Sequence, residues 1–267
     1  MPSRPGEGSA PPATVSIPAS DHLTVVTYNI HKGFSALNRR LVIHEIRDRV
    51  RALGADVAFL QEVQGEHRRH SERHESWPTQ SQHQFVARQG EHAAYGLNAT
   101  YQDGHHGNAI VSRFPIVKAE NVDISHHAWE SRGLLHCEIQ VPGWPEAVHC
   151  VNVHLGLWGR SRRMQLAWLC HRIREGVPDG SPLVVAGDFN DWRGKASAVL
   201  AQELGMGEVF QLARGRHALS FPARLPLLAL DRIYVRGLRV QAIERLSGEP
   251  WSRLSDHAAL SARLARH

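Results

Sequence analysis

The sequence predicts a single α/β domain with many strands and few helices. Apolar runs of the length of buried strands recur along the chain, whereas only a few segments carry apolar residues at helical spacing. No internal repeat or linker-like stretch divides the chain after residue 22. The 267 residues are within the length that one large α/β domain can have.

Strands are expected where short apolar runs are bounded by turn residues. The segments predicted as strands are 23–30, 56–62, 107–113, 134–141, 147–155, 183–189, 230–235, 240–246 and 257–264. Residues 64–89 are polar, rich in histidine and without periodicity, so they are predicted to form a long surface loop.

Helices are expected at 39–53, 160–174 and 196–204. The first of these has an apolar stripe with Arg and Glu opposite, and Gly54 follows it as a stop signal. Its stripe comprises Val42, Ile46, Val50 and Leu53. The candidates for the buried side of the second helix are Met164, Leu166, Leu169 and Ile173.

The net charge of +5 and the pI of about 9.5 favour an anionic partner such as nucleic acid, a phosphate ester or an anionic lipid head group. An arginine-rich composition without functional meaning explains the charge equally well. No apolar run approaches the roughly 20 residues of a membrane-spanning helix. Residues 1–22 are rich in Pro, Ser, Gly and Ala, which predicts a disordered arm and not an export signal.

The cysteines and histidines give weaker signals. Cys137, Cys150 and Cys170 have no metal-binding spacing, so reduced, buried thiols in a cytoplasmic protein are expected. Two histidine pairs, His105-His106 and His126-His127, could contribute to a zinc site. No partner spacing supports zinc, and solvated loop histidines are the favoured interpretation.

The segment Gly187-Asp188-Phe189-Asn190 closes the apolar run of residues 183–186 and is the most informative stretch. Strand side chains alternate, so Asp188 and Asn190 are expected on one face. A carboxylate beside an amide suits a hard cation or an activated water held against a phosphate.

The same construction, an apolar strand that ends on a polar side chain, recurs elsewhere. Any one of these residues alone is more often a turn residue, a helix cap or a solvated strand end. If the strand ends meet at one edge, their carboxylates repel each other unless a cation lies among them. The further positions are Asn29, Glu62, His154, Asp231, Asp256 and His257.

Taken together, these segments resemble the endonuclease/exonuclease/phosphatase superfamily over nearly the whole chain after residue 22. The motifs that carry the resemblance are Thr27-Tyr28-Asn29, Leu60-Gln61-Glu62, Gly107-Asn108-Ala109 with Ser112-Arg113-Phe114-Pro115, Asn152-Val153-His154-Leu155, Gly187-Asp188-Phe189-Asn190, Leu230-Asp231-Arg232-Ile233 and Ser255-Asp256-His257. The resemblance implies a deoxyribonuclease I-like, four-layer α/β/β/α sandwich. It also implies hydrolysis of a phosphate ester with Mg²⁺, for which Mn²⁺ substitutes.

The resemblance assigns metal ligation to Glu62, with Asn29 as a supporting amide and Asp256 as a carboxylate near the metal. Asp188 would orient and deprotonate the attacking water, and Asn190 would steady the phosphate.

The resemblance also implies that His257, held by Asp231, contacts the phosphate and assists proton transfer. His154 would donate to the phosphate or protonate the leaving oxygen. Arg132 and Asn108 are expected to bind phosphate.

The chain departs from the family pattern two positions after Asn29. Abasic-site endonucleases of the superfamily carry an acidic residue there, whereas this chain has His31, followed by Lys32. This argues against the abasic-site branch and predicts added positive charge at the phosphate, unless the pair is simply a solvated loop. The Tyr28–Gly33 and Phe221–Arg224 segments resemble a bacterial branch of uncharacterised members.

The leading hypothesis is a metal-dependent phosphodiesterase that acts as a monomer, with nucleic acid favoured as substrate by the basic charge. A phospholipid or a small phosphorylated metabolite, cleaved as a diester or a monoester, is the alternative. A catalytically silent binding module would have lost at least one of Glu62, Asp188, Asn190, Asp256 or His257, and all are present.

Overall fold

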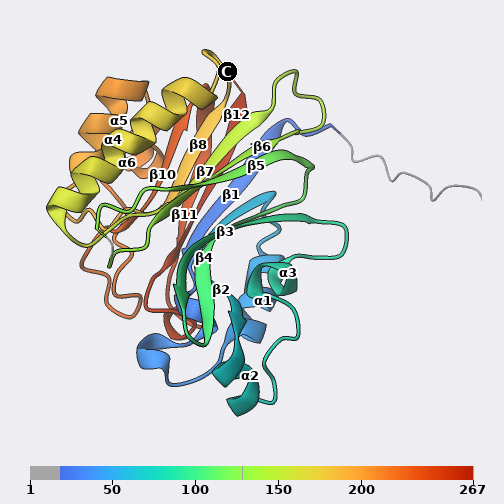
Figure 1. Ribbon diagram of the computed structural model, residues 1–267. Helices are drawn as coiled ribbons and strands as arrows, with labels where there is room; N and C mark the ends of the chain where they lie inside the picture. The colour runs from blue at the N-terminus through green and yellow to red at the C-terminus, as the bar shows by residue number, and fades with distance from the viewer. Residues whose placement is uncertain (1–18, 128, 267) are drawn as a thin grey trace, which may run out of the picture.

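Two six-stranded β-sheets pack face to face in the computed structural model, which describes residues 19–127 and 129–266 (Figure 1). The first sheet has the order β11-β12-β1-β2-β4-β3, formed by Leu238–Leu246, Ala259–Arg266, His22–Asn29, Val57–His67, Gly104–Ser112 and His92–Tyr101. The second has the order β5-β6-β7-β8-β10-β9, formed by Ile116–Asp123, Gly133–Ile139, Val148–His154, Leu183–Asp188, Asp231–Arg236 and Gly207–Glu208.

Helices cover the outer faces of both sheets, on opposite sides of the molecule in Figure 1. Helices α1 (Ile43–Ala52) and α3 (Gln82–Val86) pack on the first sheet, and α4 (Gly159–Gly176) and α5 (Lys195–Leu204) pack on the second. Short helices α2 (Arg68–Arg73) and α6 (Val209–Arg214) lie in connections. The predicted four-layer α/β/β/α sandwich is therefore confirmed.

Three apolar clusters correspond to the three contacts between these layers. The central cluster fills the space between the sheets and includes Phe59 of β2 and Ile233 of β10. The outer clusters lie under α1 and α3 and under α4 and α5. All three cysteines are buried and free, as predicted. No helix in the described ranges is both long and apolar enough to cross a bilayer.

Three strands escaped prediction, namely β3, β5 and the two-residue β9, and each lies at the edge of its sheet. Strand β5 is mostly exposed and polar, and β3 is buried only at Gly96. Edge strands bury little side-chain area, so they lack the apolar run by which central strands are recognised.

The prediction of a loop over residues 64–89 was partly wrong. Strand β2 extends to His67, and helices α2 and α3 occupy part of the remainder. Met164 was wrongly expected on the buried side of α4 and is 45% exposed. The pair His105-His106 lies in β4 and not in a solvated loop.

The predicted disordered arm, residues 1–22, falls mainly outside the described residues. Its last residues are attached to the domain: the Ser20 amide donates to Pro142 O (3.1 Å), and Trp144 Nε1 donates to Ser20 O (2.7 Å). His22 already belongs to β1. Ser20 and His22, which lie within the predicted arm, are therefore bonded into the folded domain.

Strand direction brings the polar strand ends together. Strands β1 and β2 are parallel, as are β7 and β8, so each pair ends at the same edge of its sheet. Strand β10 runs antiparallel to β8 and begins at this edge, with Asp231 opposite Asp188. The registers therefore gather the polar strand ends of each sheet at one edge, and the contact of Asn29 Nδ2 in β1 with Asp188 Oδ2 in β8 (3.3 Å) places the two edges at the same end of the sandwich.

Gly187 permits the close approach of β7 and β8 beside this edge. Its φ of +146° lies outside the range that side-chain-bearing residues normally adopt, and a Cβ atom there would lie 1.9 Å from the carbonyl oxygen of Val153. The obstacle is backbone of the neighbouring strand, which cannot rotate away.

We expect Gly187→Ala to destabilise the fold by more than about 3 kcal/mol, because it combines backbone strain with a clash in a central strand. Urea unfolding followed by circular dichroism measures the loss. Gly205→Ala is the matched control: Gly205 also has positive φ (+65°) but an open environment, so the cost there should be about 1–2 kcal/mol. Equal losses in the two variants would contradict the role given to Gly187.

Candidate active site

A shift in strand pairing creates the site on the first sheet. The pairing of β2 with β4 shifts between Leu60 and Val63, and Glu62 within the shift has a φ of +53°. In a regular strand Gln61 and Glu62 would point to opposite faces. Because the backbone at Glu62 is left-handed, Gln61 can bond to Asn152 of the second sheet while Glu62 borders the cavity.

The second sheet clamps this irregular segment through Asn152. The Asn152 Nδ2 group donates to the carbonyl oxygens of Leu60 (2.9 Å) and Ala109 (2.8 Å), and Asn152 Oδ1 accepts from Gln61 Nε2 (2.7 Å). Asn152 and Gln61 are fully buried. Unpaired amides and carbonyls are costly at such a position, so the two sheets are tied together directly beneath the site.

Asn29 connects carboxylates that come from different sheets. Its Nδ2 group lies 3.3 Å from Glu62 Oε1 and 3.3 Å from Asp188 Oδ2. Its backbone carbonyl accepts from the Ser255 hydroxyl (2.7 Å) and its Oδ1 atom accepts from the His31 amide (3.1 Å). One amide therefore fixes the separation of Glu62 and Asp188.

A second group forms around Asp188 on the other side. His257 Nδ1 lies 2.8 Å from Asp231 Oδ2, while His257 Nε2 and His154 Nε2 lie 3.8 Å and 3.5 Å from Asp188 Oδ2. Asn190 donates its amide hydrogen to Asp188 Oδ1 (2.9 Å) from a backbone with a φ of +49°. Asp188 is thus approached by two imidazoles and an amide.

Burial and neighbouring charge set the protonation states. Burial acts to lower the pKa of His257, but the carboxylates of Asp231 and Asp188 outweigh it and raise that pKa to about 10. Burial, helped by the nearby charge of Asp231, raises the pKa of Asp188 to about 6 against the opposing effect of His257. At neutral pH the site therefore holds an imidazolium beside a carboxylate that can take up a proton near pH 6.

Burial acts in opposite directions on the pKa values of His154 and Glu62, yet both pKa values are lowered. It lowers the pKa of His154 to about 3, with Arg132 acting in the same direction, so His154 is neutral at pH 7. Burial acts to raise the pKa of Glu62, but positive charge from His154 when protonated and from Lys32, together with the Asn29 amide, lowers it to about 2. Glu62 is therefore ionised throughout the physiological range.

These side chains surround one cavity of about 410 Å³. Of the residues predicted from sequence, those that line it are Glu62, Arg132, His154, Asp188, Asn190 and His257. Asn29 and Asp231 lie behind this lining and bond to it. The predicted strand-end side chains are therefore largely brought together.

Three predicted residues lie apart from the cavity lining. The Asn108 amide donates to Gly133 O (3.0 Å), so it connects β4 to β6 of the other sheet. The His31 ring and the Asp256 carboxylate lie beside the site, with His31 Nδ1 3.6 Å from Asp256 Oδ1.

Several lining residues were not identified as functional from the sequence. His106 had been grouped with solvated histidines, and its pKa is lowered to about 4 mainly by burial. An apolar side of the cavity is formed by Leu157, Trp192, Phe221, Leu228 and Leu230. Three of them had a signal in the sequence: Trp192 comes two residues after Asn190, Phe221 opens the Phe221–Arg224 segment, and Leu230 precedes Asp231 in a family motif.

A family model described as the endonuclease/exonuclease/phosphatase family matches residues 26–257. The chain belongs to this family. It is also 48% identical to the uncharacterized protein YbhP of Escherichia coli strain K12 over 241 residues, which are 90% of this chain and 95% of that protein. The predicted resemblance to this superfamily is therefore confirmed.

Solved structures share the fold at low sequence identity. The mannosyl-6-phosphatase Bt3783 of Bacteroides thetaiotaomicron has a TM-score of 0.68 at 17% identity, covering 91% of this chain and 99% of that one. TDP2 of D. rerio, solved with a single-strand DNA product, has a TM-score of 0.68 at 16% identity, covering 92% and 99%. These comparisons identify the sandwich fold.

Two groups at the site have the chemistry to hold a divalent cation. Ligand atoms of Asp188, Asp231 and His257 lie within 4.8 Å of one another, but the Asp231–His257 hydrogen bond already uses a ring nitrogen of this group. Glu62 offers ionised oxygens and borders the cavity, and Asn29 supports it by turning its Nδ2 group toward Glu62 while its Oδ1 atom accepts from the His31 amide. Oxygen donors of this kind suit Mg²⁺ and Mn²⁺, so the family's general dependence on divalent cations fits these residues.

We expect Asp188→Asn to stabilise the protein when divalent cations are absent. The folded chain binds the Asp188 proton more tightly than the unfolded chain does, so ionisation of Asp188 costs stability as the pH rises through about 6. The gain in Tm should therefore be larger at pH 8 than at pH 5, as measured by thermal melts in EDTA. Asp179→Asn, at an exposed turn, should change little at either pH. A loss of stability in Asp188→Asn at pH 8 would refute this account.

Proposed function

We propose that this chain is a divalent-metal-dependent hydrolase that cleaves phosphodiester bonds. The observation that carries the proposal is the set of contacts around Asp188: two imidazoles reach one of its oxygens, and Asn29 bridges it to Glu62. All of these groups meet at one cavity that also contains the cations Lys32 and Arg132. Such a set supplies a base, an acid and positive charge for a phosphate.

In the proposed reaction, water adds to phosphorus and the ester P–O bond breaks, with the departing oxygen taking a proton. Asp188 accepts the proton of the attacking water, since its pKa lies near neutrality. The imidazolium of His257, oriented by Asp231, supplies the proton that the departing oxygen takes, and the neutral imidazole of His154 donates a hydrogen bond to a phosphate oxygen.

Asn190 and Arg132 complete phosphate binding from the cavity wall. The Asn190 Nδ2 group donates to Leu155 O (2.9 Å), which fixes the amide at the cavity edge. We assign cation binding to Glu62, supported by Asn29. Bound Mg²⁺ or Mn²⁺ would neutralise charge on the non-bridging oxygens. Asp256 and His31 would tune this region through charge, and Asp256 adds to the raised pKa of His257.

The substrate class is open within this proposal. Nucleic acid is favoured by the net charge of +5, and one structural neighbour was solved with a single-strand DNA product. Another neighbour is a mannosyl-6-phosphatase, which supports a small phosphate ester. A catalytically silent module is disfavoured because Glu62, Asp188, Asn190 and His257 are all present and border one cavity, and Asp256 is also present.

Hydrolysis of bis-p-nitrophenyl phosphate should require Mg²⁺ or Mn²⁺ and should stop in EDTA. Asp188→Ala and His257→Ala should each lower kcat/KM by roughly 10²–10⁴-fold, because each removes a group that acts in the transition state. Asp179→Ala, remote from the site, is the control and should retain activity. Activity that survives chelation or both substitutions would sink the proposed mechanism.

Binding of Mn²⁺ should depend on Glu62 even without substrate. Glu62→Gln should weaken Mn²⁺ binding by at least about tenfold, since it removes the only ionised ligand that we assign. Titration followed by electron paramagnetic resonance measures this directly. Glu66→Gln, exposed on the same strand, is the matched control. Unchanged Mn²⁺ affinity in Glu62→Gln would show that the cation is held elsewhere.

A further inference from the structure

Large apolar side chains are exposed on segments that border the site cavity. On one side are Leu157, Trp158 (65% exposed) and Trp192, which are contributed by the turns after β7 and β8. On the other are Leu225 (66%), Leu227 (64%) and Leu228. We call these six residues the apolar rim. Exposed apolar residues scattered singly need no explanation, but a group of them around one opening marks a binding surface.

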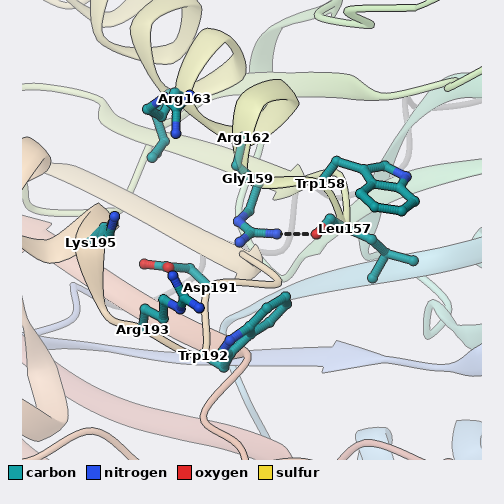
Figure 2. Close-up of a pocket in the computed structure, with 10 residues that line it drawn as sticks. Leu157, Trp158, Gly159, Arg162, Arg163, Asp191, Trp192, Arg193 and Lys195 are labelled. Atoms are coloured by element: carbon teal, nitrogen blue, oxygen red, sulfur yellow. Dashed lines mark hydrogen bonds between the residues drawn. The ribbon is translucent and has the colours of Figure 1, made fainter.

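The first side of the rim encloses a second cavity of about 560 Å³ (Figure 2). This cavity shares Leu157 and Trp192 with the site cavity, so the two adjoin across these side chains. Figure 2 shows Trp158 and Leu157 on one side of it and Arg163 and Lys195 on the other. A ligand that enters both cavities therefore meets an apolar surface beside positive charge.

The other side of the rim is a short hairpin. An isolated bridge pairs Phe221 with Leu228, both of which line the site cavity, and the Phe221 ring lies 5.0 Å from that of His257. Arg224, Leu225 and Leu227 lie between these paired residues and are exposed. The hairpin thus presents leucine side chains and a cation to solvent at the edge of the site.

Positive charge accompanies the apolar rim in the lining of the second cavity. The second cavity is lined by Arg162, Arg163, Arg193 and Lys195, and its single carboxylate, Asp191, is buried and accepts from the Ala196 amide (2.7 Å). Arg162 lies over the Trp192 ring at 4.7 Å, which holds this indole in place.

We propose that the apolar rim docks on an anionic phospholipid surface, and that the substrate is an amphiphilic phosphate ester drawn from that surface. This inference rests on the proposed function for the chemistry of the site cavity. The apolar part of the substrate lies along Leu157 and Trp192 into the second cavity. Exposed tryptophan and leucine with nearby arginine and lysine are suited to the boundary of an anionic bilayer.

The leucines distinguish this partner from nucleic acid. Single-stranded nucleic acid binds through phosphate contacts and stacking on aromatic rings. Leu157, Leu225 and Leu227 offer neither a ring nor a hydrogen bond, and burial in lipid is the interaction by which they contribute. The cations could bind either nucleic acid or an anionic lipid surface, so the exposed leucines are the observation that favours lipid.

Sedimentation with vesicles tests the docking without relying on activity. The full chain should sediment with phosphatidylcholine vesicles that contain phosphatidylglycerol and much less with pure phosphatidylcholine. Leu225→Ser/Leu227→Ser should weaken binding by roughly tenfold or more, since it removes two exposed apolar groups. Leu97→Ser/Val117→Ser, which changes two exposed side chains that line neither cavity, should bind like the wild type. Thermal melts establish that both variants are folded.

Two results would overturn the proposal: no binding to phosphatidylglycerol vesicles, or equal binding by the wild type and the Leu225/Leu227 variant. Rim-dependent binding of a single-stranded oligonucleotide, with no vesicle binding, would assign the rim to nucleic acid instead.

A failure of metal-dependent hydrolysis with intact vesicle binding would refute the proposed function and not the docking surface. With Mg²⁺, phosphatidylglycerol should be cleaved in preference to the oligonucleotide; the reverse preference would refute the assigned substrate class.

Discussion

The site depends on one interaction between the two sheets, the buried amide of Asn152. It bonds to the carbonyls of Leu60 and Ala109 at the place where the pairing of β2 and β4 shifts, and it accepts from Gln61. A strand irregularity of this kind leaves backbone groups that need partners, and the opposite sheet supplies them. The same shift turns Glu62 toward the cavity. The arrangement that joins the sheets is therefore also the arrangement that places the proposed metal ligand.

The second constraint is electrostatic. Asp188 and Asp231 are buried close together, and neither could remain charged without compensation. The imidazolium of His257 lies between them, and the Asn29 amide connects Asp188 to Glu62. These contacts give the groups different protonation states. His257 is a cation and Glu62 an anion at neutral pH, whereas the pKa of Asp188 is about 6. Groups with such divided pKa values are suited to proton transfer.

The charged cavity and its apolar rim are complementary to different parts of a substrate. The charged floor of the cavity is complementary to a phosphate, whereas its rim is apolar at both the Leu157–Trp158 turn and the 221–228 hairpin. Net charge by itself made nucleic acid attractive, because composition counts cations without locating them. Once placed, several of those cations border exposed tryptophan and leucine side chains, and a lipid surface satisfies both.

The sequence by itself determined the central strands, the family and the polar strand-end residues that meet at the cavity. Buried strands such as β8 are continuous apolar runs, and the polar residue that ends each run is visible without coordinates. Tertiary structure decided the edge strands β3 and β5, which bury too little to leave a pattern. It also decided the roles of Asn108 and Asn152, two buried asparagines that join the sheets away from the cavity lining. The hydrogen-bond partner of a buried amide depends on residues that are distant in the chain. The same is true of the pKa shift that burial causes. A local sequence pattern therefore cannot predict either of them.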